Sequence, residues 1–175
     1  MNKHEIASWL KSLLIAFGIA MVIRVFLFSP YYVEGASMDP TLHDEEKIFV
    51  NKFEELDRGD IVIIKGEEKN KNYVKRLIGF PGDELEMKDD HLYINGKKWD
   101  EDYLSENRKA AEGIVNKLTG DFGPLTVPED HYFVMGDNRL VSLDSRNGLG
   151  FIEKERIIGV SEFVWYPFSN IRKVE

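Results

Sequence analysis

The sequence predicts a mainly β domain that follows one N-terminal transmembrane helix. Three observations support this prediction: an apolar run near the amino terminus, a series of short segments rich in Val, Ile, Tyr and Phe, and turn residues between those segments. A length of 175 residues is enough for one such domain and an anchor, because domains usually contain on the order of 100–200 residues.

Composition and charge exclude several classes of protein. With 43% hydrophobic and 31% charged residues, the chain can form a packed core. Residues 1–29 hold three basic side chains and one acidic, so the remaining 20 basic and 30 acidic side chains leave the body with a net charge of −10. No nucleic-acid partner is expected, because phosphate binding requires clustered Lys and Arg. The absence of cysteine excludes disulfides, thiolate catalysis and cysteine metal sites.

The transmembrane prediction rests on residues 10–28, which are apolar except for Lys11, Ser12 and Arg24. A helix of this length measures about 28 Å, which matches the hydrocarbon thickness of a bilayer. Arg24 lies near the outer end, where its side chain can reach the headgroups. Basic residues precede the helix, so we expect residues 1–29 to form a cytoplasmic N-terminus and anchor, and residues 30–175 to form an extracytoplasmic domain.

A cleavable signal peptide is the alternative interpretation of this segment. Ala36 is the first small residue that could precede a cleavage site, and Glu34 stands two residues before it, where a small side chain would be required. The apolar run is also long for a signal peptide. These features favour an uncleaved anchor that contacts the lipid bilayer.

The body is expected to consist of short strands separated by turns. Asn95-Gly96 between two such segments is typical of a two-residue hairpin, because both turn positions need positive φ. Pro81-Gly82 marks a second turn. The expected strands cover residues 31–34, 47–51, 60–65, 73–79, 83–87, 91–94, 97–99, 132–136 and 157–165.

Residues 105–118 have a helix-forming composition and form the one clear helix expected in the body. Residues 152–156 could add one helical turn. The segment from about residue 84 to residue 128 is the most polar part of the body. We therefore expect this segment to be an insertion or small subdomain beside the central sheet.

Three stretches hold residues that could perform chemistry, and the first contains Ser37. Gly35 and Ala36 before it leave room for a substrate backbone, and Pro40 fixes the turn that follows. A serine in such a loop is more often a turn residue than a nucleophile. Its assignment therefore depends on finding a base.

Histidine is the usual base for a hydroxyl nucleophile. His4 would be cytoplasmic, whereas His43, His91 and His131 lie in acidic or turn-like segments and have no metal-ligand spacing. Each is more typical of a surface residue. Neither a histidine base nor a metal site is therefore expected.

The second stretch supplies a lysine, which can act as a base if burial lowers its pKa by several units from about 10.4. Strand alternation places Lys75 on one face with Tyr73 and Leu77, and places Arg76 on the other. Each basic side chain must therefore share its face with bulky apolar neighbours. A solvated lysine at a strand edge is the competing interpretation. Arg76 cannot be the base, since guanidinium groups stay protonated in proteins.

The third stretch concentrates polar side chains within ten residues just after an apolar run. Such a segment is either a polar surface loop or a hydrogen-bonded loop that orients a base. Its polar members are Asp137, Asn138, Arg139, Ser142, Asp144, Ser145 and Arg146.

Together these stretches resemble the type I signal peptidase family, in the small form typical of Gram-positive bacteria. The resemblance is carried by Ser-Met-Asp-Pro-Thr-Leu at 37–42, by Val-Lys-Arg-Leu-Ile-Gly-Phe-Pro-Gly-Asp at 74–83, and by Gly-Asp-Asn-Arg at 136–139 with Ser-Leu-Asp-Ser-Arg at 142–146. Their order behind an apolar segment is very specific, and the resemblance covers nearly the whole chain. It implies the signal-peptidase/LexA-like β fold.

The resemblance implies a membrane-bound serine endopeptidase with a Ser/Lys dyad, in which Ser37 is the nucleophile and Lys75 the general base. It also implies that Ser142 hydrogen-bonds and orients the Lys75 amine. An ion pair between Asp144 and Arg146 would stiffen the loop behind that amine. No metal or organic cofactor is implied.

By the same resemblance, Met38 and Leu77 would contribute to the surface that binds exported preproteins. Their signal peptides carry small residues at positions −1 and −3 from the cut. Gly35 departs from the pattern, because some members have there a serine whose hydroxyl serves the oxyanion hole. The oxyanion would then depend on the Ser37 N–H, with a water molecule or another amide as the alternatives for a second donor. Val141, where many members have Asn, is a milder departure.

Two other functions are kept as alternatives. A self-cleaving repressor of the LexA type shares the Ser/Lys chemistry and the β fold, but it carries a DNA-binding domain where this chain has an apolar segment. A catalytically silent, membrane-tethered preprotein-binding paralogue would have the fold without turnover. The joint presence of Ser37, Lys75 and Ser142 argues against a silent paralogue.

Overall fold

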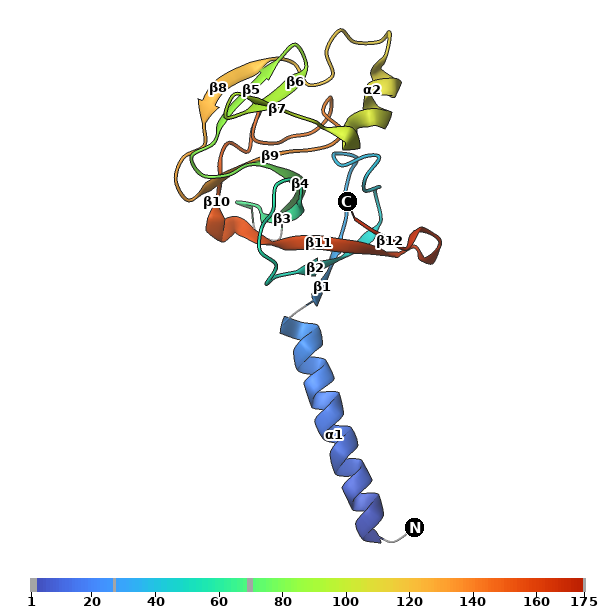
Figure 1. Cartoon of the computed structure of the whole chain (residues 1–175). Helices are drawn as coiled ribbons and strands as arrows, with labels where there is room; N and C mark the ends of the chain where they lie inside the picture. The colour runs from blue at the N-terminus through green and yellow to red at the C-terminus, as the bar shows by residue number, and fades with distance from the viewer. Residues whose placement is uncertain (1–2, 27, 69–70, 175) are drawn as a thin grey trace.

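The computed structural model describes residues 3–26, 28–68 and 71–174. A single helix, α1 (Lys3–Phe26), extends from a mainly β body, and the amino terminus lies at its far end (Figure 1). Within these ranges, no helix combines the length and the apolar character needed to cross a bilayer. Residues 1, 2 and 27 of the predicted anchor, and the side chain of Arg24, lie outside what is described. The mainly β prediction is confirmed.

The larger sheet contains eight strands among the described residues, in the order β1-β2-β11-β3-β4-β9-β10, with β12 paired to β11. All recorded neighbours are antiparallel. The strands are β1 (Phe28–Tyr32), β2 (Lys47–Asn51), β3 (Ile61–Lys65), β4 (Asn72–Gly79), β9 (His131–Met135), β10 (Ile152–Glu153), β11 (Ile157–Tyr166) and β12 (Arg172–Lys173).

A second sheet, in the order β7-β6-β5-β8, lies at the end of the body away from α1 (Figure 1). The predicted turn at Asn95 and Gly96 joins two of its strands, and both residues have positive φ. The strands lie within the segment predicted to be an insertion, although the division into domains stays a prediction. They are β5 (Glu84–Lys88), β6 (His91–Ile94), β7 (Lys97–Trp99) and β8 (Phe122–Thr126).

The helix expected at 105–118 is wrong in length, because α2 (Ser105–Ala111) ends after seven residues. Gly113 follows with a φ of +74°, a conformation that terminates helices. The chain then turns, and the Asp90 carboxylate accepts the backbone N–H of Leu118 at 2.9 Å. Short 3-10 turns occupy η1 (Asp102–Leu104), η2 (Lys154–Arg156) and η3 (Phe168–Asn170).

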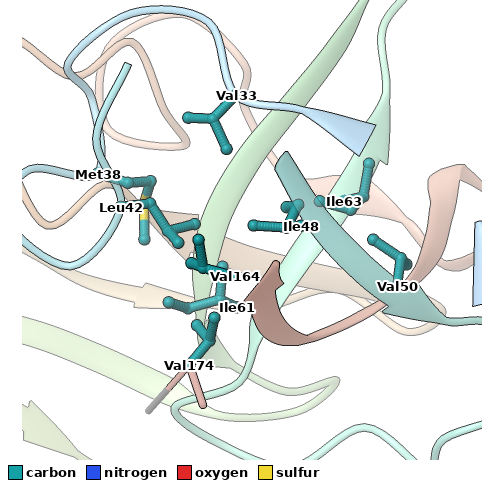
Figure 2. Packing of buried hydrophobic residues seen from close by; sticks show 9 residues of the cluster. All are labelled: Val33, Met38, Leu42, Ile48, Val50, Ile61, Ile63, Val164 and Val174. Atoms are coloured by element: carbon teal, nitrogen blue, oxygen red, sulfur yellow. The ribbon is translucent and has the colours of Figure 1, made fainter. Parts of the chain in front are cut away.

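The first core cluster fixes the loop that follows β1 (Figure 2). Val33, Met38 and Leu42 come from that loop and are almost completely buried against β2, β3 and β11. Burying an apolar side chain of this size contributes about 1.5–3 kcal/mol. The loop between these anchors is therefore held close to the sheet. The remaining members are Ile48, Val50, Ile61, Ile63, Val164 and Val174.

Two further clusters cover β4 and β9. The second joins Ile78, Phe133 and Met135 to apolar residues of the small sheet, so this sheet packs directly on those strands. The third contains Leu77 and Val134, together with Val62, Ile64, Tyr132, Ile152 and Val160. β4 is consequently enclosed by packed side chains, and its position is fixed before any polar contact is considered.

Candidate active site

Ser37 lies in a tight turn between two buried anchors of the first core cluster. The Asp39 N–H donates to the Ala36 carbonyl at 3.2 Å, and the Leu42 N–H donates to the Met38 carbonyl at 3.0 Å. Burial of Met38 orients the turn so that Ser37 remains partly exposed. The sequence thus places an accessible hydroxyl on a rigid support.

Lys75 approaches this hydroxyl from β4, where it pairs with Val62 of β3. Its Nζ lies 2.7 Å from Ser37 Oγ and donates to the Val74 carbonyl at 2.8 Å. The residue is 3% exposed. The structure therefore brings together the two residues predicted as nucleophile and base, which are 38 positions apart in the chain.

Burial lowers the pKa of the Lys75 amine from 10.5 to about 8, because a charged amine is poorly solvated there. The nearby carboxylates Asp144 and Asp137 act in the opposite direction and limit the decrease. An amine with such a pKa is partly neutral near neutral pH. It can therefore accept a proton from an adjacent hydroxyl.

The loop after β9 contains the predicted ion pair. Arg146 Nε donates to Asp144 Oδ1 at 2.9 Å and its terminal nitrogen donates to Oδ2 at 2.8 Å. Asp144 also accepts the Gly136 N–H at 3.0 Å. Burial alone would raise the pKa of Asp144, but the contacts with Arg146 and the Gly136 amide hold it below its usual value. Asp144 thus stays ionised and fastens the loop.

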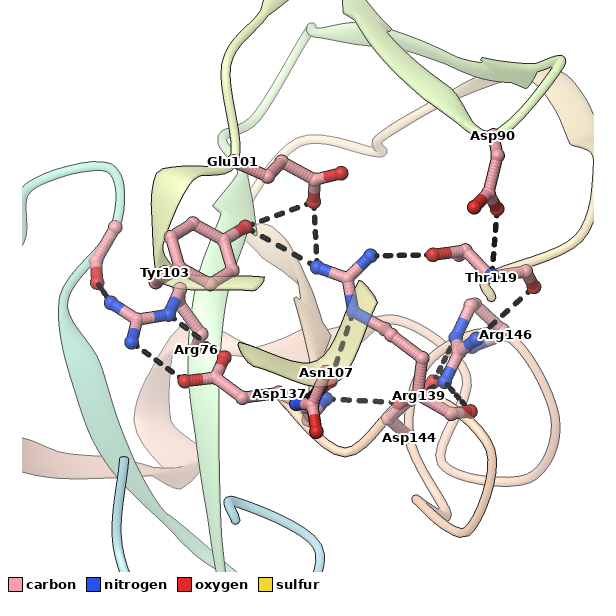
Figure 3. Close-up of polar contacts among 12 residues, drawn as sticks. Arg76, Asp90, Glu101, Tyr103, Asn107, Thr119, Asp137, Arg139, Asp144 and Arg146 are labelled. Atoms are coloured by element: carbon pink, nitrogen blue, oxygen red, sulfur yellow. Dashed lines mark hydrogen bonds and ion pairs between the residues drawn. The ribbon is translucent and has the colours of Figure 1, made fainter. Parts of the chain in front are cut away.

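A second acid in this loop, Asp137, is held more extensively than the sequence indicated (Figure 3). Arg76 binds it through Nε at 2.9 Å and a terminal nitrogen at 2.7 Å. Thr41 Oγ1 donates to the same carboxylate at 2.6 Å. Asp137 is fully buried and links β4, the Ser37 loop and the end of β9. A buried arginine requires an acidic partner. Arg76, next to the base Lys75 in the chain, was therefore the sequence feature from which a partner such as Asp137 could have been predicted.

Gly136 has no space for a side chain. A Cβ atom there would lie 2.2 Å from Ser142 Oγ and 2.5 Å from the Ser37 carbonyl oxygen. Both contacts are far shorter than van der Waals separation. Glycine at this position therefore allows the two loops to approach each other closely.

Ser142 lies next to this contact and is 2% exposed. Its Oγ makes no hydrogen bond of normal geometry among the residues the structure describes, although it lies near enough to the Asp144 carboxylate to help lower the pKa of that group. The amine of Lys75 contacts Ser37 and Val74 instead. The orienting role of Ser142 therefore stays a prediction.

An elongated groove of about 500 Å³ lies beside Ser37. Its walls include residues 30–34 and 71–75, and Met38 also lines it. Leu77 does not line the groove, because it is fully buried in the third core cluster. β1 is terminal in the sheet order, and β9 pairs with β4 only from Arg76 onward. Among the described strands, both walls thus have backbone edges without a strand partner.

Comparisons with known proteins identify the family. The protein-family model described as "Signal peptidase, peptidase S26" matches residues 6–166 of this chain. The chain is 62% identical to a signal peptidase I of Bacillus licheniformis over 178 residues, covering 99% of this chain and 96% of the relative. It is 60% identical to signal peptidase I T of Bacillus subtilis (strain 168), covering 95% and 89%. This chain belongs to the signal peptidase family, peptidase S26.

The fold of this signal peptidase family member agrees with that assignment. A crystal structure of a signal peptidase I from Enterococcus faecalis V583 matches it with a TM-score of 0.56 and 40% identity, covering 61% of this chain and 97% of that chain. The type I signal peptidase resemblance predicted from the three motifs is confirmed. Family membership favours this interpretation over the self-cleaving repressor.

Other polar groups near the site have separate partners. His43 contacts Asp39 through Nδ1 at 2.7 Å, and His91 and His131 contact backbone carbonyls, so none of these three contacts Ser37. The Gly35 N–H donates to Asp44 Oδ1 at 2.8 Å. The Ser37 N–H makes no hydrogen bond within the described part of the chain. This amide is available to a substrate oxygen.

Lys75→Met is expected to increase the free energy of unfolding at pH 7 by about 1–3 kcal/mol. The pKa of Lys75 is lowered from 10.5 to about 8, so folding at pH 7 must bury a charged amine, at a cost of roughly 3 kcal/mol. The lost hydrogen bonds offset about 1 kcal/mol of the gain. Urea unfolding of the wild type and the variant measures this difference.

The gain from Lys75→Met should shrink between pH 8 and pH 10.5, because the unfolded wild type binds more protons than the folded form in that window. Lys65→Met is the matched control, since Lys65 is exposed on the adjacent strand β3. It should change stability by less than about 0.5 kcal/mol at either pH. A loss of stability in Lys75→Met at pH 7 would contradict the pKa assignment.

Proposed function

We propose that this chain is a type I signal peptidase that hydrolyses one peptide bond in exported preproteins, with Ser37 as nucleophile and Lys75 as general base. The observation that carries the proposal is the 2.7 Å contact between Lys75 Nζ and Ser37 Oγ. This distance allows direct proton transfer between the two groups. A buried amine with a lowered pKa is the form of lysine that such chemistry requires.

In the first step, neutral Lys75 takes the proton of Ser37 as Oγ attacks the scissile carbonyl carbon. The carbonyl oxygen becomes an oxyanion, which the Ser37 N–H stabilises. The tetrahedral intermediate collapses when the ammonium group of Lys75 donates its proton to the leaving amine. Lys75, neutral again, activates a water molecule that hydrolyses the ester and releases the signal peptide.

Three other residues support the base in this proposal. Ser142, which lies beside Gly136, would orient the Lys75 amine when a substrate approaches. Asp144 and Arg146 keep the Ser142 loop in place through their two-point ion pair. Asp144 raises the pKa of Lys75, but burial of the amine outweighs this effect, so the loop is fastened while the lysine pKa stays lowered.

The substrate is proposed to bind as an extended strand along the groove. The partner-free edges of β1 and β4 can supply backbone hydrogen bonds to it. Met38 contributes to the floor, whereas Leu77 supports the site from beneath. In this proposal the groove accepts small side chains at −1 and −3 and excludes large ones, as the family resemblance implies.

We further propose that residues 1–29 form a cytoplasmic end and a single membrane anchor, and that residues 30–175 form an extracytoplasmic catalytic domain. α1 has 24 residues, about 36 Å of helix, a length that exceeds the hydrocarbon layer. Among the described residues no helix is both long and apolar enough to cross it, so the proposal rests on the apolar sequence of residues 10–28 as a whole. Apolar side chains such as Trp9, Leu13 and Phe17 are 65–75% exposed on it. Lipid would cover this surface, and Ser37 would then act close to the membrane.

Ser37→Ala and Lys75→Arg are expected to lower turnover of a preprotein by at least about 10³-fold, because each removes one member of a pair that acts as a unit. The arginine variant keeps the positive charge but cannot be deprotonated. Sequencing the amino terminus of the product measures cleavage and locates the cut. Lys65→Ala, on an exposed residue of β3, is the control and should retain wild-type turnover.

Wild-type turnover in Ser37→Ala or Lys75→Arg would contradict the dyad assignment. Absence of any cleavage by the wild-type chain, or cleavage only at random positions, would contradict the proposed function as a whole.

The pH dependence of kcat/KM should rise with pH through an apparent pKa of about 8, because only neutral Lys75 can accept the Ser37 proton. The rate at pH 6 should be about 100-fold below the plateau. The profile of kcat should have a lower pKa, since a docked substrate removes more water from the amine. A rise centred near 6.5 that His43→Ala abolishes would contradict a lysine base.

The full chain should stay in the membrane pellet after an alkaline carbonate wash, whereas a chain that begins at residue 30 should be released. A protease added outside right-side-out vesicles should digest the body and leave the amino terminus intact. Release of the full chain by carbonate, or protection of the body from protease, would contradict the proposed anchor and its orientation.

A further inference from the structure

We propose that Asn107, on α2, is a positioning residue that keeps Ser37 and Lys75 at reacting distance, an inference that rests on the proposed function. α2 belongs to the polar segment beside the small sheet, in the predicted insertion. Its Asn107 side chain lies beside Asp137 (Figure 3) and also contacts the Ser37 loop. The segment would thereby take part in the alignment of the catalytic groups.

The amide nitrogen of Asn107 donates to two carbonyl oxygens. One belongs to Asp39, two residues after Ser37, at 2.9 Å. The other belongs to Asp137, in the loop after β9, at 2.8 Å. Both amide hydrogens are used, one on each loop. A single side chain that belongs to neither loop therefore links the two loops.

The two loops also contact each other directly, through residues on either side of Asp39 in the chain. The Asn138 N–H donates to the Ser37 carbonyl at 3.1 Å, and its side chain donates to the Ala36 carbonyl at 3.0 Å. Thr41 donates to the Asp137 carboxylate. The Asn107 bond to the Asp39 carbonyl adds a contact between those of Ser37 and Thr41.

The residues that lead into α2 are held to the body by buried charged side chains. Arg139 donates to Glu101 at 2.6 Å, and both side chains are at most 1% exposed. The Tyr103 ring stacks on the Arg76 guanidinium at 4.0 Å and its hydroxyl donates to Glu101 at 2.9 Å. These contacts hold the residues that directly precede α2, so the start of the helix that carries Asn107 is fixed relative to the site.

The chemistry explains why this spacing matters. Proton transfer depends on the Lys75–Ser37 distance, and a misplacement of about 1 Å at a catalytic group can lower the rate about 100-fold. Lys75 is fixed by β4, whereas Ser37 is carried by a loop. Asn107 does not line the groove, so its loss should affect the reacting geometry rather than substrate binding.

The test compares Asn107→Ala, Asn107→Asp and Asn116→Ala in the full chain, using a preprotein with small residues at −1 and −3. Asn107→Ala should lower kcat about 10- to 100-fold and leave KM within about twofold. Asn107→Asp has the same size but points a carboxylate oxygen at two carbonyl oxygens. It should lose at least as much kcat. Asn116 is exposed and makes no hydrogen bond to the described residues, so Asn116→Ala should match the wild type.

All assays are run about 15 °C below the lowest melting midpoint, so that loss of folded protein does not lower the rate. Retained kcat in either Asn107 variant overturns the inference, and so does a rise in KM at constant kcat. Failure of both variants to fold also overturns it, because Asn107 would then support the fold alone. A wild-type chain that cleaves no preprotein overturns the proposed function itself, and the inference with it.

Discussion

The burial of the Lys75 amine is the constraint on which the rest of the site depends. An amine removed from water binds a proton less strongly, and the pKa of about 8 follows from this decrease. The body achieves it by ordinary packing: β4 lies between β3 and β9, and core clusters cover both of its faces. A folded state that must bury this group is less stable than it could be, which is typical of catalytic residues.

The same constraint explains how the neighbouring charges are arranged. Asp137 and Asp144 both favour the protonated amine, so free carboxylates at these positions would return Lys75 towards its ordinary pKa. Each is instead bound by an arginine through two hydrogen bonds, Asp137 by Arg76 and Asp144 by Arg146. The pairs hold the loops while much of their field is cancelled locally. Structural rigidity and a low lysine pKa are therefore compatible.

Those features of the fold and the site that depend on local sequence patterns could be predicted from the sequence. Alternation and turn residues located most strands, and the motifs around Ser37 and Lys75 located the two groups that meet at 2.7 Å. The strands β8, β10 and β12 were missed. β8 forms against β5, a partner distant in the chain, whereas β10 and β12 have only two residues each, too few to show alternation. At residues 152–156, where one helical turn was expected, only residues 154–156 form a 3-10 turn. The bonds of Asn107 were missed because its acceptors lie 68 and 30 positions away. Contacts between residues so far apart in the chain cannot be predicted from the periodicity or the composition of the sequence.

The polar segment beside the small sheet shows why those distant contacts matter. Buried ion pairs such as Glu101–Arg139 are poor sources of stability compared with apolar packing, but their geometry is strict. A hydrophobic contact tolerates sliding, whereas a two-point hydrogen bond is lost after a shift of about 1 Å. The core fixes Lys75 and holds the Ser37 loop against the sheet, and polar contacts set the final position of this loop relative to the amine. Reactivity and alignment thus come from two different kinds of interaction within one small domain.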